Sequence, residues 1–202
     1  KDQFQITNSM KEALVSCKKF YSELDMDNPQ MQKKLMELIQ LKDGKTIENY
    51  MEPKDFEVFD QQYKAITGMS ILAFKQYKPF LGMSFLILKA TSCNNTVQPE
   101  TALMQLAQQN HLDILGIETP DEQMAIINKE PIDSQLATMR KMVNNFDSCK
   151  QLMQEMTELY LKKDVESLYQ YMKQTGVNEN FETSMLINRN NKWIPKMTKA
   201  IK

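Results

Sequence analysis

Two acidic side chains stand on a short segment that has the alternating pattern of a β-strand. Within residues 20–26 apolar and polar residues alternate, so Glu23 and Asp25 share one face, about 6.6 Å apart along the predicted strand. Both lie near its carboxyl end, and Glu118 ends a second predicted strand over residues 113–118. Each predicted strand leads directly into a helix N-terminus, and ligands of open α/β sheets collect at that edge.

If the two strands pair in parallel, three carboxylates converge at one edge of the sheet. Carboxylates in such a place suit a hard divalent cation or general acid–base catalysis. The alternative is that Glu23 and Asp25 are solvated or interact with the positive end of a helix dipole.

A second candidate group lies on the last predicted helix, residues 181–202. Arg189 and Asn190 fall on the apolar stripe of this helix, between Leu186 and Trp193. An unpaired buried polar group costs about 1–3 kcal/mol, so these two side chains need hydrogen-bond partners. Glu23 or Glu118 would be a suitable bidentate acceptor for the guanidinium. The alternative, which the pattern supports equally, is that Arg189 and Asn190 belong to a polar network that only stabilises the fold.

The elements that must position these residues are mostly helical. The pattern predicts about nine helices and two strands, with a helical insertion at about 46–110 and a long-helix region at 133–175. Two predictions concern apolar surfaces: a hairpin over residues 69–90, broken at Lys78-Pro79, and one long helix over 133–162 with a heptad-like stripe. Because two strands do not make a stable sheet alone, we expect a small, mainly parallel sheet whose other strands are missing from this chain or very short.

Composition excludes several classes of function. The 202 residues carry 25 Lys+Arg and 26 Asp+Glu, which favours one domain over 1–202 and argues against a nucleic-acid binder with a basic surface. The five scattered glycines form no phosphate-binding loop, and the single histidine, His111, cannot complete a His-rich zinc site within the chain. Charged residues and a proline interrupt the most apolar stretch, which excludes a membrane span there.

Five short pieces, in this order, resemble the TraB/PrgY/GumN family, which includes the Tiki proteins. Their rough spacing holds across nearly the whole chain, and together they are fairly specific. The Lys- and Met-rich, helix-rich composition resembles a bacterial, GumN-type member. The pieces are Ser22-Glu23-Leu24-Asp25, Lys78-Pro79-Phe80, Glu100 with Leu103 and Ala107, Gly116-Ile117-Glu118-Thr119 with Glu122-Gln123, and Arg189-Asn190 with Trp193.

The resemblance implies a metal-dependent hydrolase, proposed to be a peptidase, with an α/β core like that of erythromycin-esterase-like and ChaN-like proteins. Glu23 would carry over as a ligand of a divalent metal ion or as the general base. Arg189 and Asn190 would carry over as the family's polar pair, and Glu118 matches a family-typical glutamate. The implied partner is a peptide or protein substrate, an oligomer is allowed, and the implied location is extracytoplasmic, in the periplasm or at the cell surface.

The chain departs from the family pattern in one respect. The family's two GxxH motifs are absent, and we expect them on strands before Lys1 and beyond Lys202, so the chain resembles the middle of a longer protein. The alternative function is a non-catalytic peptide- or protein-binding regulator, using a methionine-rich helical groove made by residues 69–90 and 136–160. Exposure of that groove would favour the binding protein.

Overall fold

The computed structural model describes residues 5–91, 98–175 and 183–201. Internal contacts divide the chain into two compact units, each assembled from separate segments. The strand unit comprises Lys1–Leu38, Asn94–Ala125 and Asn190–Lys202, and the helical unit comprises Ile39–Cys93 and Ile126–Arg189.

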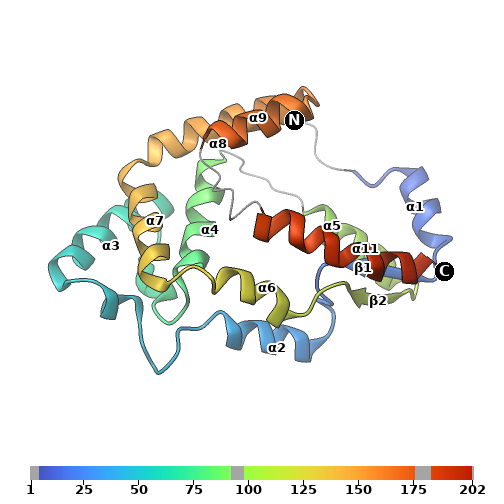
Figure 1. Cartoon of the computed structure of the whole chain (residues 1–202), viewed down its shortest axis with the longest axis horizontal. Coiled ribbons are helices and arrows are strands. Elements are labelled where there is room, and N and C mark those ends of the chain that lie inside the picture. Colours follow the sequence, from blue (N-terminus) through green and yellow to red (C-terminus); the bar gives the residue numbers. More distant parts are fainter. Residues whose placement is uncertain (1–4, 92–97, 176–182, 202) are drawn as a thin grey trace. The chain divides into compact units, whose positions relative to one another are not determined.

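The strand unit is built around a two-stranded parallel sheet. β1 (Lys19–Ser22) pairs with β2 (Asp113–Gly116), with Lys19 opposite Asp113 and Ser22 opposite Gly116. Helix α5 (Pro99–Gln109) packs against both strands, and Figure 1 shows these three elements together. The predicted helix-rich α/β fold with a small parallel sheet is confirmed. The other helices of this unit are α1 (Asn8–Val15), α2 (Pro29–Leu38), the start of α6 (Pro120–Ile127) and most of α11 (Asn188–Ile201).

Both strands end earlier than the sequence predicted. β1 stops at Ser22 because the chain turns at once, with Met26 N donating to Leu24 O and Asn28 N to Asp25 O. Asn28 Oδ1 then accepts from Gln30 N at 2.9 Å, as an N-cap of α2 does. Glu23 and Asp25 therefore follow the strand instead of sharing one of its faces.

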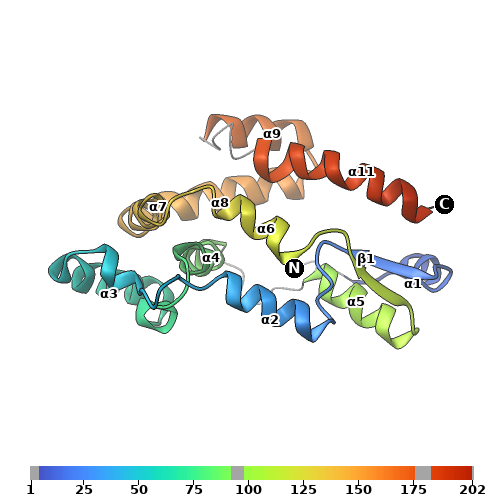
Figure 2. The ribbon, with the colours of Figure 1, turned by 60° about the horizontal axis from the view of Figure 1, so that its bottom comes forward.

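The helical unit packs around α4 (Pro79–Ala90). This helix contacts α3 (Pro53–Thr67), α7 (Ile132–Asn144) and α8 (Phe146–Leu161), and Figure 2 shows α4 and α7 nearly end-on beside each other. The Tyr63 hydroxyl is buried here and donates to the Gly82 carbonyl at 3.1 Å. The remaining elements are η1 (Ile47–Tyr50), η2 (Ile71–Phe74), α9 (Val165–Gln174) and a π-helical turn η3 (Thr183–Ile187). Across the described residues, no helix has the length and apolarity that a membrane span requires.

The prediction of one helix over 133–162 is wrong. The chain breaks at Asn145 (φ −122°, ψ 37°), whose Nδ2 donates to Lys141 O and caps the end of α7. The first part of the predicted stripe is core, since Leu136, Met139 and Val143 are buried. In the predicted 69–90 hairpin, the second arm is α4, but the regular part of the first arm is only η2.

Candidate functional site

The parallel ladder continues beyond the strands and joins two of the predicted site residues. Ile117 N donates to Ser22 O at 2.9 Å, and Glu118 N donates to Glu23 O at 2.8 Å. The backbone therefore holds Glu23 and Glu118 at the same carboxyl edge of the sheet. This proximity follows from parallel pairing, as the sequence predicted.

The two acids have different surroundings. Glu23 is exposed, and its Oε2 accepts a hydrogen bond from Gln123 Nε2 at 2.9 Å. Gln123 lies in the first turn of α6 and reaches back across the strand ends. Glu118 is only 5% exposed. Glu23 is thus the acid of this edge that a ligand in solvent can reach.

A capping box makes the turn that carries Gln123 rigid. Thr119 N donates to Glu122 Oε2 at 2.9 Å, and Glu122 N donates back to Thr119 Oγ1 at 3.2 Å. Lys196 of α11 donates to the Ile117 carbonyl at 2.7 Å and lies 3.4 Å from Glu122. The hydrogen bond from Thr119 N, assisted by the Lys196 charge, lowers the pKa of Glu122.

An open cleft of about 480 Å³ lies beside Glu23. It has two carboxylates, three amide side chains and three apolar side chains on its walls. Amide side chains both donate and accept hydrogen bonds, so they match the polar groups of a peptide backbone. The lining residues are Ser22, Glu23, Leu24, Met26, Gln32, Gln98, Glu100, Thr101, Met104 and Gln123.

Asp25 has a local partner. A side-chain hydrogen bond with Asp27, together with burial, raises the pKa of Asp25. Asp25 does not line the cleft beside Glu23. Of the three predicted carboxylates, Glu23 lines this cleft, and the convergence of all three side chains stays a prediction.

The polar pair of the last helix lies in the first turn of α11. Arg189 is half-buried, Asn190 is exposed, and Trp193 on the next turn is half-buried. The contact of Arg189 with Glu23 or Glu118 stays a prediction, as do the roles of Arg189 and Asn190. The predicted start of this helix, residues 181–182, lies outside the described residues.

The described residues do not by themselves fit a divalent metal ion. No three His, Cys, Asp or Glu side chains among them gather closely enough to hold one. At the cleft, Glu23 contributes one carboxylate and its bonded neighbour is the Gln123 amide. His111 is exposed in the turn between α5 and β2, with φ of 57°. A metal ion at this edge remains a prediction from the resemblance.

Sequence analysis did not identify the contacts of Gln123 and Lys196. The contact of Gln123 could have been predicted, because the first helical turn after the second strand of a parallel pair faces the carboxyl end of the first strand. No feature of the sequence indicated the contact of Lys196, because a lysine one turn after Trp193 on an amphipathic helix is ordinarily a solvated residue.

Comparison with known proteins identifies a family. A model of the TraB/PrgY/gumN family matches residues 1–202, the whole chain. No curated protein and no solved structure matches significantly.

Proposed function

Because the chain belongs to the TraB/PrgY/gumN family, we propose that it acts on peptides as a hydrolase, with the cleft beside β1 as substrate site. Glu23 is the acid–base carboxylate of this proposal. The observation that carries it is the 2.9 Å hydrogen bond that orients the exposed Glu23 carboxylate at the wall of the cleft.

The chain supplies three parts of the proposed chemistry. The Glu23 carboxylate takes a proton from the water that attacks the peptide carbonyl, and returns it to the departing amine as the C–N bond breaks. Gln123 keeps that carboxylate oriented, and the amides of Gln32 and Gln98 pair with the substrate backbone. Arg189 and Asn190 complete the proposal as the residues that bind a substrate carboxylate and orient its neighbour.

The metal-dependent form of the proposal adds a divalent cation, which the resemblance implies. Among the described residues, Glu23 is the proposed ligand of this cation. A single carboxylate does not make a metal site, so Glu23 would be only one member of the ligand set. The test is calorimetric titration with Mn²⁺ and Zn²⁺, where Glu23→Gln is expected to weaken binding. Equal affinity in the wild-type protein and Glu23→Gln would remove Glu23 from the ligand set.

The hydrolase is tested on the full-length gene product with a mixed peptide library and mass spectrometry. We expect Glu23→Gln to lower kcat/KM by about 100-fold or more, the size of a lost general base. The matched control is Glu37→Gln on α2, which removes an exposed acid of the same unit outside the cleft. Unchanged cleavage by Glu23→Gln would overturn the role of Glu23.

Peptide binding without cleavage is the second candidate, and the cleft wall favours it. Its amides and the apolar Leu24, Met26 and Met104 can hold an extended peptide without any catalytic group. The same library, read by fluorescence anisotropy, distinguishes the two. Binding that survives Glu23→Gln, with no product formed by the wild-type protein, would support the regulator and overturn the hydrolase.

A further inference from the structure

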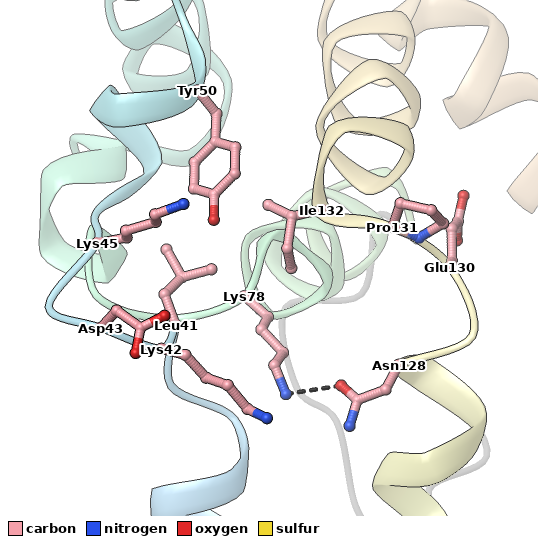
Figure 3. Close-up of a pocket in the computed structure, with 10 residues that line it drawn as sticks. All are labelled: Leu41, Lys42, Asp43, Lys45, Tyr50, Lys78, Asn128, Glu130, Pro131 and Ile132. Atoms are coloured by element: carbon pink, nitrogen blue, oxygen red, sulfur yellow. Dashed lines mark hydrogen bonds between the residues drawn. The ribbon is translucent and has the colours of Figure 1, made fainter.

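A second hollow, in the helical unit, carries three lysines. It has a volume of about 320 Å³ and lies where three segments of the unit meet. Figure 3 shows these segments: the turn after Leu41, the start of α4 at Lys78, and the link from Asn128 to Ile132. We call it the lysine pocket, defined by Leu41, Lys42, Asp43, Lys45, Tyr50, Lys78, Asn128, Glu130, Pro131 and Ile132.

A tight turn holds two of these lysines in place. Asp43 and Gly44 have φ of 59° and 65°, and Lys45 N donates to Lys42 O at 3.1 Å. Two successive left-handed residues with this hydrogen bond, in an Asp-Gly sequence, have the form of a type I′ turn. Lys42 and Lys45 stand at its two ends, so their backbones have little freedom.

Backbone hydrogen bonds also fix this turn relative to Lys78. Leu41 N donates to Gln76 O at 2.8 Å, and Lys78 N donates to Ile39 O at 2.9 Å. These bonds flank the antiparallel bridge between Gln40 and Tyr77. The fold itself therefore brings Lys42 and Lys78 to one hollow.

Lys78 is the buried cation of the pocket. It is 6% exposed, and its Nζ donates to Asn128 Oδ1 at 2.7 Å. Burial lowers the pKa of Lys78, and the positive charge of Lys42 lowers it further. Figure 3 shows both side chains extending into the same part of the hollow. Two ammonium groups this close repel each other, and an anion near both would offset that repulsion.

The rest of the wall fits a small organic group. Leu41, Pro131 and Ile132 are apolar, and the Tyr50 ring lies beneath Lys45 Nζ at 5.5 Å from its centroid. Two carboxylates, Asp43 and Glu130, also line the pocket, and Figure 3 shows both away from the Lys78 ammonium. The ionisable lining is thus three lysines against two acids, and the buried one among them is Lys78.

We propose that the lysine pocket binds a small phosphate monoester, with the phosphate near Lys42 and Lys78 and the organic group against Tyr50 and Ile132. A phosphate monoester carries nearly two negative charges at neutral pH, which matches two ammonium groups. Lysine binds phosphate as a point charge. This site belongs to the helical unit, and the inference does not depend on the proposed hydrolase.

The test is binding of phenyl phosphate to the full chain by isothermal titration calorimetry. We expect a Kd of about 1 mM or tighter. Lys42→Met and Lys78→Met are each expected to weaken binding by about fivefold or more, the size of a lost charge-assisted hydrogen bond. The matched control, Lys54→Met on α3, removes an exposed lysine outside the pocket and is expected to leave Kd unchanged.

Two results would overturn the proposal, and a third would remove its subsite for the organic group. One is phenylacetate binding as tightly as phenyl phosphate, because a monoanion would then suffice. The other is unchanged affinity in Lys42→Met, which alters an exposed residue and is expected to fold normally, whatever Lys78→Met does to stability. Displacement of bound phenyl phosphate by inorganic phosphate alone, with equal affinity, would also count against a subsite for the organic group.

Discussion

Gly116 has no room for a side chain, because main-chain atoms lie where a Cβ would stand. A Cβ there would lie 2.8 Å from Asp25 N and 3.0 Å from Glu118 O, both main-chain atoms of the strand ends. We expect Gly116→Ala to cost about 1–3 kcal/mol of stability in urea denaturation, because these atoms cannot rotate away. Gly82→Ala is the control, because its Cβ would meet the side-chain ends of Ile71 and Met139 instead of main-chain atoms. Alanine also favours a helix over glycine by up to about 1 kcal/mol, so we expect this variant to lose less stability than Gly116→Ala. Equal stability of the two variants would contradict this account.

Tyr63 gives the helical unit a pH dependence at high pH. Burial raises the pKa of Tyr63 from 10.0 to about 12. Between pH 10 and 12 the unfolded chain releases a proton that the folded chain keeps, so this contribution to stability is complete below pH 10 and decreases as pH rises.

Tyr63→Phe is expected to abolish that decrease and to cost about 1 kcal/mol at pH 7, since the hydroxyl no longer donates to Gly82. Urea denaturation at pH 7 and pH 11 measures both effects. Tyr160→Phe, on a residue 72% exposed, is expected to change stability at pH 7 by less than about 0.5 kcal/mol. A pH 11 loss that persists in Tyr63→Phe would refute the assignment.

The start of α6 is the element that connects the sheet to the cleft. Thr119→Ala removes one half of the capping box and is expected to cost about 1 kcal/mol at pH 7. The pKa of Glu122 is lowered on folding, so its contribution is present above pH 4.5 and is lost as pH falls through the lowered value. Thr119→Ala keeps the Thr119 N–H that lowers this pKa, so its cost is expected to change little with pH. Glu122→Gln removes the carboxylate itself, and we expect its stability difference from wild type to shrink at low pH, measured by urea denaturation. Thr198→Ala on α11 is the control, and a pH-independent difference for Glu122→Gln would be the contrary result.

At the scale of the whole molecule, buried surface is unevenly distributed among the helices. α3, α4 and α7 contribute side chains that are almost fully inaccessible, whereas none of the described residues of α9 and α11 is buried. We expect amide hydrogen exchange to be slowest in α3, α4 and α7. We expect it to be fastest in α9 and α11, because local opening of these two helices exposes little apolar surface. Equal protection in α4 and α9 would contradict this order.

Local rules were sufficient for much of the fold. The bounds of α3 and α5 follow from local signals, since each helix begins at a proline in its first turn and ends where its apolar period ends. The capping box at Thr119 and the parallel pairing of the two strands were also predictable. Each follows from hydrogen-bonding and steric constraints within a few residues, or from the handedness of strand–helix units.

The candidate sites depended on contacts between distant parts of the chain. The bond from Gln123 to Glu23 spans 100 positions, and the bond from Lys78 to Asn128 spans 50. Periodicity says which face of an element is apolar, but not which polar side chain of another element reaches it. The sequence alone therefore determined the family resemblance, the strand-end acids and the helix starts. Tertiary structure alone decided which amide orients Glu23 and which two lysines share a pocket, because long-range packing selects those partners.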